Sequence, residues 1–214
     1  MTYQPQHQFQ NRDLLPHYTF VPAYLEIINI VLNKALAEYP RTLVVRFDLH
    51  MPAIPSCIDL PIPDEPNVIS RFMDSLKAQI KADLIRKKRE NIRVHNCRVR
   101  FVWVKERNEA QQPHYHVAIF LNKDTYHTLG DYLSFGNNLS SKIQNAWASA
   151  LKVEFKDIIG LVHFPQNTPL YYLDVNAVNY KIQYHSVFKR LSYLAKIETK
   201  QYGSGGKNIG CSFI

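Results

Sequence analysis

The sequence has little of what a membrane protein or a disulfide-stabilised protein requires. No apolar run among its 214 residues approaches the roughly 20 residues needed to cross a bilayer. Its three cysteines, Cys57, Cys97 and Cys211, are odd in number and contain no Cys-x-x-Cys pair, which argues against a disulfide framework and a zinc ribbon. Residues 2–20 are polar and lack the apolar segment of a signal peptide. We therefore expect a soluble, cytoplasmic protein that does not engage a membrane.

Acidic residues are also in deficit. Lys and Arg total 26 against 18 Asp and Glu, which gives a formal net charge of +8 and a pI near 9.3. Such an excess favours polyanionic partners, most commonly nucleic acid, although a basic surface without any partner is the plain alternative. The length and the apolar fraction of 46% suit one good-sized core. We expect a flexible N-terminal arm over residues 1–16 and a single domain over residues 17–214.

Hydrophobic periodicity gives the expected order of elements. It predicts helices over residues 24–39, 67–91, 138–153 and 176–200, and strands over residues 41–50, 99–106, 113–121 and 158–164. Residues 51–66 carry five prolines and are expected to form a long loop. The order strand, helix, strand, strand, helix, strand is that of an α+β fold with a ferredoxin-like (split βαβ) antiparallel sheet. In that fold, helices cover one face of the sheet and the other face is open.

A His-x-His pair opens the third predicted strand. Side chains alternate along a strand, so His114 and His116 point to the same side, roughly 7 Å apart along the chain. Two imidazoles at one point can hold a divalent metal, and a carboxylate or third nitrogen normally completes such a pair. Glu106 ends the preceding strand and would share their face in a hairpin. It is our first candidate for the third ligand, followed by His50 and then Asp48. Two half-exposed histidines beside a turn are the alternative.

Tyr193 lies off the apolar side of the last predicted helix. Its neighbours at helical spacing are Lys189, Lys196 and Lys200, whereas a core tyrosine would have apolar neighbours there. A lysine-flanked phenol suits a position against a phosphodiester backbone. A solvent-facing basic stripe that happens to contain a tyrosine is the competing interpretation.

Further basic residues are candidates for contacts with a nucleic-acid backbone. They are Arg86, Lys87, Lys88 and Arg89 at the end of the second predicted helix, and Arg98 and Arg100 before and within the next strand. Basic residues at a helix C-terminus also complement the helix macrodipole and commonly just face solvent.

The order of these motifs resembles the HUH endonucleases. His114-Tyr-His116 is followed downstream by Tyr193-Leu-Ala-Lys196, and Tyr193 to Lys200 is similar to the Tyr-Val-Ala-Lys-Tyr-x-x-Lys helix of rolling-circle replication initiators from isometric single-stranded DNA phages. Ile197 stands where those proteins carry a second tyrosine, so the resemblance is to a single-tyrosine enzyme. Residues 41–211, including the Gly-Lys-Asn-Ile-Gly-Cys ending, resemble the prophage-encoded YagK/YfjJ domain family of inovirus-type replication proteins.

The resemblance implies an activity. Mg²⁺ or Mn²⁺ would be held by His114, His116 and Glu106 on the open sheet face, with the tyrosine helix laid across it. Tyr193 would nick single-stranded DNA at a replication origin and form a 5′-phosphotyrosine, with Lys196 assisting. The partners would be single-stranded DNA and the origin; recruitment of a host helicase is left open. The alternatives are a single-tyrosine HUH transposase, a structural metal site, and a non-enzymatic single-strand-binding module that stacks bases on Phe101, Trp103 and Tyr115.

Overall fold

The computed structural model describes residues 14–52, 67–107, 113–132, 136–166, 169–197 and 207–212. Its helices are α1 (Pro22–Glu38), α2 (Val68–Arg89), α3 (Leu139–Leu151) and α4 (Tyr180–Leu191), with short 3₁₀ helices η2 (Phe155–Ile158) and η3 (Ser192–Ala195). Its strands are β1 (Arg41–His50), β2 (Arg100–Arg107), β3 (Pro113–Asn122), β4 (Val162–His163), β5 (Leu170–Asp174) and β6 (Ile209–Cys211). Within these ranges no helix is both long and apolar enough to cross a membrane.

The strands form one antiparallel sheet in the order β4-β1-β3-β2-β6, and β5 pairs with β1 beside β4. The central order, β4-β1-β3-β2, together with α2 between β1 and β2 and α3 between β3 and β4, is the split βαβ arrangement. The α+β, ferredoxin-like prediction is therefore confirmed. The short β5 and β6 are additions that the sequence analysis did not anticipate.

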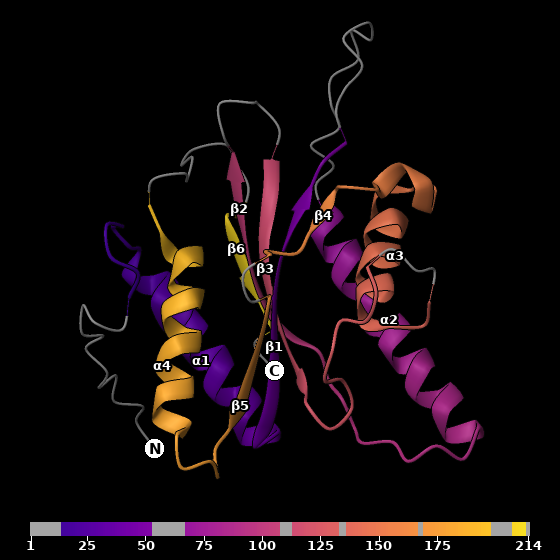
Figure 1. Ribbon diagram of the computed structural model, residues 1–214. Coiled ribbons are helices and arrows are strands. Elements are labelled where there is room, and N and C mark those ends of the chain that lie inside the picture. The colour runs from indigo at the N-terminus through magenta and orange to yellow at the C-terminus, as the bar shows by residue number, and fades with distance from the viewer. Residues whose placement is uncertain are drawn as a thin grey trace, which may run out of the picture.

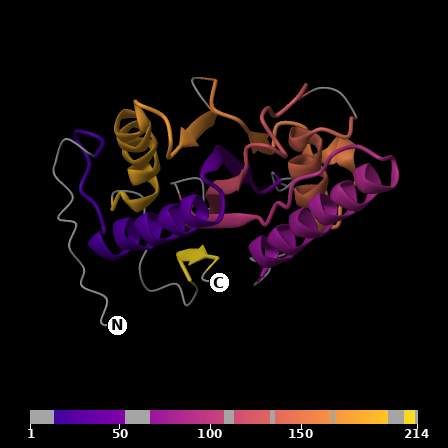
Figure 2. The ribbon, with the colours of Figure 1, turned by 90° about the horizontal axis from the view of Figure 1, so that it is seen from below.

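Alternation along β1 divides the sheet into two faces. Val45, Phe47 and Leu49 pack in the core formed with α2 and α3, whereas Val44 packs in a second core with α1 and α4. The two helix pairs accordingly lie on opposite sides of the sheet, as both views of the ribbon show (Figures 1 and 2). The protein is a three-layer structure with the sheet in the middle.

The α2 and α3 face carries the larger aromatic core. Phe72, Leu76 and Ile80 recur along α2 at helical spacing and are almost wholly buried. Trp147 on α3 is also fully buried, and its indole N–H donates a 2.9 Å hydrogen bond to the carbonyl of His50 at the end of β1. That bond ties the end of the first strand to the helix behind it.

The opposite face is covered more fully than a ferredoxin-like sheet requires. We expected it to be open, but α1 places Ile28 and Leu32 against it at zero exposure, and α4 adds Phe188 and Leu191. Apolar strand residues fill most of this face. Thr42 and Arg100 are polar exceptions at one end, and a larger group of polar side chains lies at the other end, where β1 and β2 finish and β3 begins.

Several element boundaries differ from the predictions. The fourth strand is two residues long, because η2 ends at Ile158 and a turn over residues 159–161 follows it before β4 begins. The last helix ends at Leu191 and tightens into η3, rather than continuing to residue 200. Most of the predicted N-terminal arm and most of the proline-rich loop lie outside the described residues, as does Lys200.

Candidate active site

The sheet register brings the two histidines and Glu106 together. Glu106 on β2 is the direct cross-strand partner of His114 on β3, and Val104 is the partner of His116. On the other side of β3, His50 is opposite His114 and Asp48 is opposite His116. All of these polar side chains share the face of the sheet that α1 and α4 cover. The antiparallel hairpin that we predicted is confirmed, and it has the register that the Glu106 hypothesis needed.

The side chains of Glu106, His114 and His116 form a cluster that can bind a metal. Their relative exposures are 1%, 9% and 6%, and one ligand atom from each lies within 4.8 Å of the others. His116 Nε2 lies 3.0 Å from Glu106 Oε2 and 3.2 Å from His114 Nε2, and His114 Nε2 lies 3.8 Å from the same oxygen. Ligands at right angles around a Mg²⁺-sized ion, each about 2.1 Å from it, are about 3.0 Å apart. The donor set and its spacing therefore fit a divalent ion.

A second layer of residues orients His116. Its Nδ1 donates to the Asp48 carboxylate, and the Arg46 guanidinium donates to the same oxygen. Arg46 Nη2 is also 2.8 Å from Nδ1, which is a close contact rather than a hydrogen bond once Nδ1 carries its proton. Such a carboxylate–histidine pair fixes the tautomer that leaves Nε2 free as a ligand. Asp48, our third-ranked metal ligand, is placed here behind a ligand instead.

The electrostatics of the cluster favour neutral imidazole at His114. Burial, with a smaller effect from the neighbouring His116, lowers the pKa of His114 to about 4. Burial alone would raise the pKa of Asp48, but the hydrogen bond from His116 and the charge of Arg46 outweigh it and lower the pKa below its ordinary value. At neutral pH, His114 is thus an uncharged donor and Asp48 is an anion, the states that metal binding requires.

His50 lies beside the cluster without completing it. Its ring stacks on that of His114, with centroids 5.6 Å apart and planes 10° apart. Burial lowers the pKa of His50 too. Among the described residues, the compact group of potential metal ligands consists of Glu106, His114 and His116, so Glu106 is better placed than His50 as the third donor.

Tyr193 and Lys196 lie directly over the cluster. The ammonium of Lys196 donates a 2.7 Å hydrogen bond to the Tyr193 hydroxyl and lies 3.3 Å from Glu106 Oε2. The ring of Tyr193 is edge-on to that of His116, with centroids 5.2 Å apart. Burial would lower the pKa of Lys196, but the hydrogen bond to Tyr193 and the charge of Glu106 raise it above its ordinary value. Lys196 is therefore a charged donor between the phenol and the carboxylate.

An N-terminal segment, residues 18–21, holds the Tyr193–Lys196 turn in place. Phe20 forms a β-bridge with Lys196, the Val21 amide donates to the Ala195 carbonyl, and the Ile197 amide donates to the Thr19 carbonyl. Tyr18 is 41% exposed and packs edge-on against Tyr193, with centroids 5.8 Å apart. Sequence reasoning missed this segment because its pairing spans about 175 residues.

Arg46 beside the phenol and Arg190, whose charge acts on Arg46, were also missed. Arg46 is 2% exposed, its guanidinium carbon lies 5.8 Å from the Tyr193 ring centroid, and its Nε has no hydrogen-bond partner among the described residues. The Nε of Arg190 on α4 is likewise buried and unpartnered there. Burial, with a smaller effect from the charge of Arg190, lowers the pKa of Arg46. Residue parity along β1 places Arg46 with Asp48 and could have revealed it.

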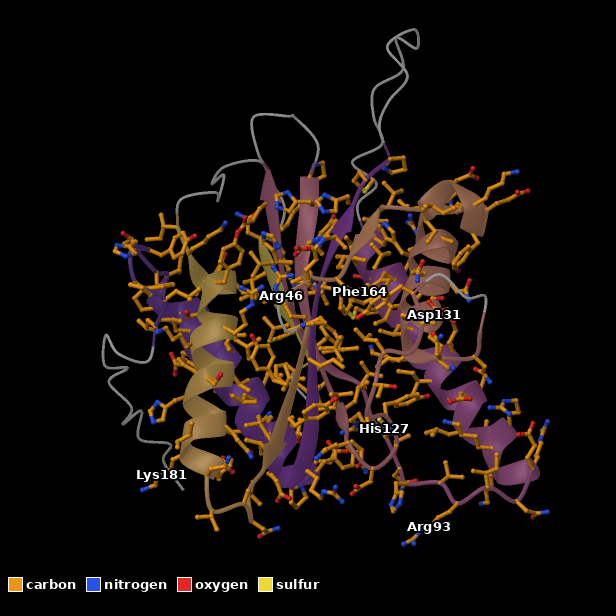
Figure 3. The ribbon with its side chains drawn as sticks, viewed as in Figure 1. Arg46, Arg93, His127, Asp131, Phe164 and Lys181 are labelled. Carbon is orange, nitrogen blue, oxygen red and sulfur yellow. The ribbon has the colours of Figure 1, made fainter. Side chains whose placement is uncertain are left out.

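Most of the predicted nucleic-acid contacts are not gathered at this site. Arg86 and Lys87 pair with the buried Asp83, and Arg100 is buried against Glu38, so neither the pair nor Arg100 is a free surface cation. The end of α2, which carries Arg86 to Arg89, lies at the opposite end of the sheet and on its other side (Figure 1). Arg93, just past that end, is drawn far from Arg46 (Figure 3).

Five of the predicted basic residues are exposed in the described ranges: Arg86, Lys88 and Arg89 on α2, Arg98 before β2, and Lys189 on α4. Arg86 is also held in ion pairs with Asp83 and Glu90. Of the exposed residues, Lys189 belongs to the last turn of α4, three residues before η3 begins, and is the one nearest in sequence to Tyr193.

The chain was compared with known families, curated proteins and solved structures. A protein of Escherichia coli (strain K12) called "Uncharacterized protein YagK" is 42% identical over 201 residues, covering 92% of this chain and 96% of that protein. "Uncharacterized protein YfjJ" of the same organism is 33% identical over 198 residues, covering 90% and 94%. No solved structure matches. The family model described as YagK/YfjJ C-terminal domain matches residues 6–212, and the chain therefore belongs to that family.

Proposed function

We propose that the protein is a metal-dependent endonuclease that nicks single-stranded DNA through a 5′-phosphotyrosine intermediate. The observation that carries this proposal is the Tyr193 hydroxyl, 2.7 Å from the Lys196 ammonium, which in turn lies 3.3 Å from the carboxylate of a buried Glu–His–His cluster. A nucleophile, a cation and a set of metal ligands thus meet at one point. A purely structural metal site would need neither Tyr193 nor Lys196.

Glu106, His114 and His116 would hold Mg²⁺ or Mn²⁺. Three protein ligands leave coordination positions for phosphate oxygens, and a bound divalent ion would polarise the scissile phosphodiester. Arg46 and Asp48 keep His116 in the ligating tautomer. The two imidazole nitrogens and the carboxylate oxygen also suit Mn²⁺, so Mn²⁺ is the ion to use in the first assays.

Tyr193 would attack the phosphorus in line. Its oxygen forms a new P–O bond, the bond from phosphorus to the 3′-oxygen of the preceding nucleotide breaks, and the proton lost by the phenol balances the one gained by that 3′-oxygen. Phenols ionise near pH ~10 in water, so the oxygen needs an adjacent cation at neutral pH. Lys196 supplies that cation and Arg46 adds a second positive charge beside the ring. Covalent capture conserves the bond for rejoining.

A non-enzymatic module that stacks bases on sheet aromatics is not supported. Phe101, Trp103 and Tyr115 all point into the core under α2 and α3 and are at most 9% exposed. Initiation of rolling-circle replication, as opposed to transposition, rests on the resemblance of the motifs to replication initiators. A strand-transfer assay on hairpin ends separates the two roles, because an initiator leaves a 3′-OH that primes synthesis.

The proposal is tested with labelled single-stranded fragments of the DNA that neighbours the gene. Incubation with Mn²⁺ should give a protein–DNA adduct that survives denaturation, and a nicked product whose 3′-end a polymerase extends. Tyr193→Phe should form neither product. The control Tyr184→Phe removes a hydroxyl on α4 that donates a hydrogen bond to Asn29 on α1, and it should form both. Equal adduct from Tyr193→Phe and wild type would show that another group is the nucleophile.

A further inference from the structure

A basic pocket lies on the other face of the sheet, outside the cluster described above. Its volume is about 600 Å³, and it is formed by α2, the start of β2 and the end of β6. Three cations, Lys77, Lys81 and Arg98, line it together with apolar side chains that include Leu84, Ile85 and Phe101. Lys88, one turn beyond Leu84, extends the basic surface along the same side of α2. The pocket thus joins positive charge to apolar surface.

No negative charge lines this pocket. None of its lining residues is acidic, although Lys77 makes a long 3.5 Å ion pair with the exposed Asp74. Two cysteines also line it. Cys97 packs against the core under α2 and α3, whereas Cys211 packs against the core under α1 and α4; burial raises the pKa of Cys97 to about 11 and also raises the pKa of Cys211. Both thiols are therefore neutral at physiological pH. The Lys77 ammonium lies 5.2 Å from the centroid of the Phe101 ring, so cation and aromatic surface are adjacent.

We propose that this pocket binds an unpaired nucleotide of the DNA strand that the active site cuts. The inference rests on the proposed function. A nucleotide matches the pocket because its base offers a flat apolar surface to Leu84 and the exposed Ile85, while its phosphates pair with Lys77, Lys81 and Arg98. Single-strand binders combine these two elements, a positive track and apolar or aromatic contacts to bases, without reading sequence.

The pocket is connected to the active site through β2. Phe101 lines the pocket and Glu106 belongs to the metal-binding cluster. They are five residue steps apart along β2, which corresponds to roughly 17 Å. Their side chains point to opposite faces, since Phe101 packs toward α2 and Glu106 toward Tyr193. A DNA strand that occupies both the pocket and the active site must pass around the edge of the sheet at β6. We therefore expect tight binding only from oligonucleotides long enough to reach both.

The test measures binding and cutting separately. Tyr193→Phe protein in EDTA cannot cut, so its affinity for long and short oligonucleotides can be measured at several salt concentrations. The same measurement is made on the variant that carries Lys77→Gln/Lys81→Gln in addition. Losing two contacts should lower the slope of log affinity against log salt by about 1.4 on long strands only. The control, Lys152→Gln/Lys181→Gln, removes two exposed charges elsewhere and should leave the slope unchanged. The proposal would be overturned if the salt slope fell equally in the control variant, or if it did not fall in the pocket variant.

A second readout locates the strand. In Cys57→Ser/Cys97→Ser/Cys211→Ser protein that also carries Ile85→Cys, a long oligonucleotide should slow alkylation of the thiol at position 85, which lines the pocket, and a short one should not. Unchanged alkylation would also overturn the proposal. Failure of the nuclease proposal would be seen separately. In that case the wild-type protein would form no covalent adduct, and this outcome does not depend on the salt slope or the alkylation rate.

Discussion

Charge at the candidate site is arranged as a chain of buried partners. Arg46 donates to Asp48, Asp48 accepts from His116, and Glu106 lies between the histidine nitrogens and the Lys196 ammonium. Buried ions are costly unless each has a partner, and here each does. Removing one member leaves another uncompensated, so single substitutions should have effects beyond the residue that is changed.

Asp48→Asn should weaken Mn²⁺ binding by about 10- to 100-fold, because His116 loses the carboxylate that fixes its tautomer. Titration calorimetry of the purified protein measures the affinity. His163→Ala removes an exposed imidazole 3.6 Å from the other oxygen of Asp48 and should leave the affinity nearly unchanged. Asp48→Asn with wild-type affinity would show that Asp48 does not support the metal site.

Lys196→Gln should slow formation of the tyrosyl adduct by about 100-fold, since a neutral amide cannot stabilise the phenolate or the charge that builds on the phosphate. Lys181→Gln removes an exposed lysine in the first turn of α4, far from the cluster in sequence; it is the matched control and should react like wild type. The rate is read from single-turnover time courses. Adduct formation by Lys196→Gln at the wild-type rate would remove Lys196 from the mechanism.

In EDTA, the free energy of unfolding should fall as pH is lowered from 6.5 toward 4. His114 has an ordinary pKa of 6.5 and a folded-state pKa of about 4, so the unfolded chain binds more protons in that window and acid favours unfolding, by up to about 3 kcal/mol. Urea titrations at several pH values measure the slope. His114→Asn should flatten it, and an unchanged slope in that variant would assign it to other groups.

At the scale of elements, the candidate nucleophile depends on a turn rather than on a long helix. α4 ends at Leu191, and η3 together with the bridge from Phe20 sets the direction of Tyr193 and Lys196. The helical spacing of the lysines singled out the tyrosine that lies over the cluster, although this part of the chain is not a continuous helix. Lys196 reaches the Tyr193 hydroxyl across a 3₁₀ turn, and no local pattern announces the N-terminal segment that anchors this turn.

Tyr18→Ala should slow adduct formation by about tenfold with little change in thermal stability. The exposed Tyr18 ring packs edge-on against Tyr193, and removing it lets the nucleophile drift from its position. Tyr132→Ala removes another exposed tyrosine, which stacks on Phe164 away from the cluster, and should not affect the rate. If the two variants react equally fast, residues 18–21 anchor the turn through their backbone alone.

The central sheet was predictable because alternation and element order are local signals. The polar and apolar alternation over Val45 to His50 and the short connection after β2 were enough to predict the β1 and β3 faces and the β2–β3 hairpin, and hence the union of Glu106 with His114. The short β5 and β6 and the packing of α1 on the second face depend on contacts between distant parts of the chain. Those contacts leave no periodic trace in the sequence.

For the whole molecule, net charge was a poor guide to the surface. Arg46 and Arg100 are buried, and Asp83 pairs with Arg86 and Lys87 and lies 3.7 Å from Lys142, so several basic residues are engaged inside the fold. The formal charge of +8 counts them together with the cations of the surface. Burial and pairing decide which basic residues remain available, and neither can be read from composition.

The most direct measurement of the central claim is peptide mapping of the covalent adduct. After reaction with a single-stranded oligonucleotide and Mn²⁺, nuclease trimming and proteolysis, mass spectrometry should find the remaining 5′-phosphonucleotide on the peptide that contains Tyr193, attached to that tyrosine. A nucleotide on another residue, linkage through a 3′-phosphate, or cleavage of the cognate strand without any covalent intermediate would contradict the account.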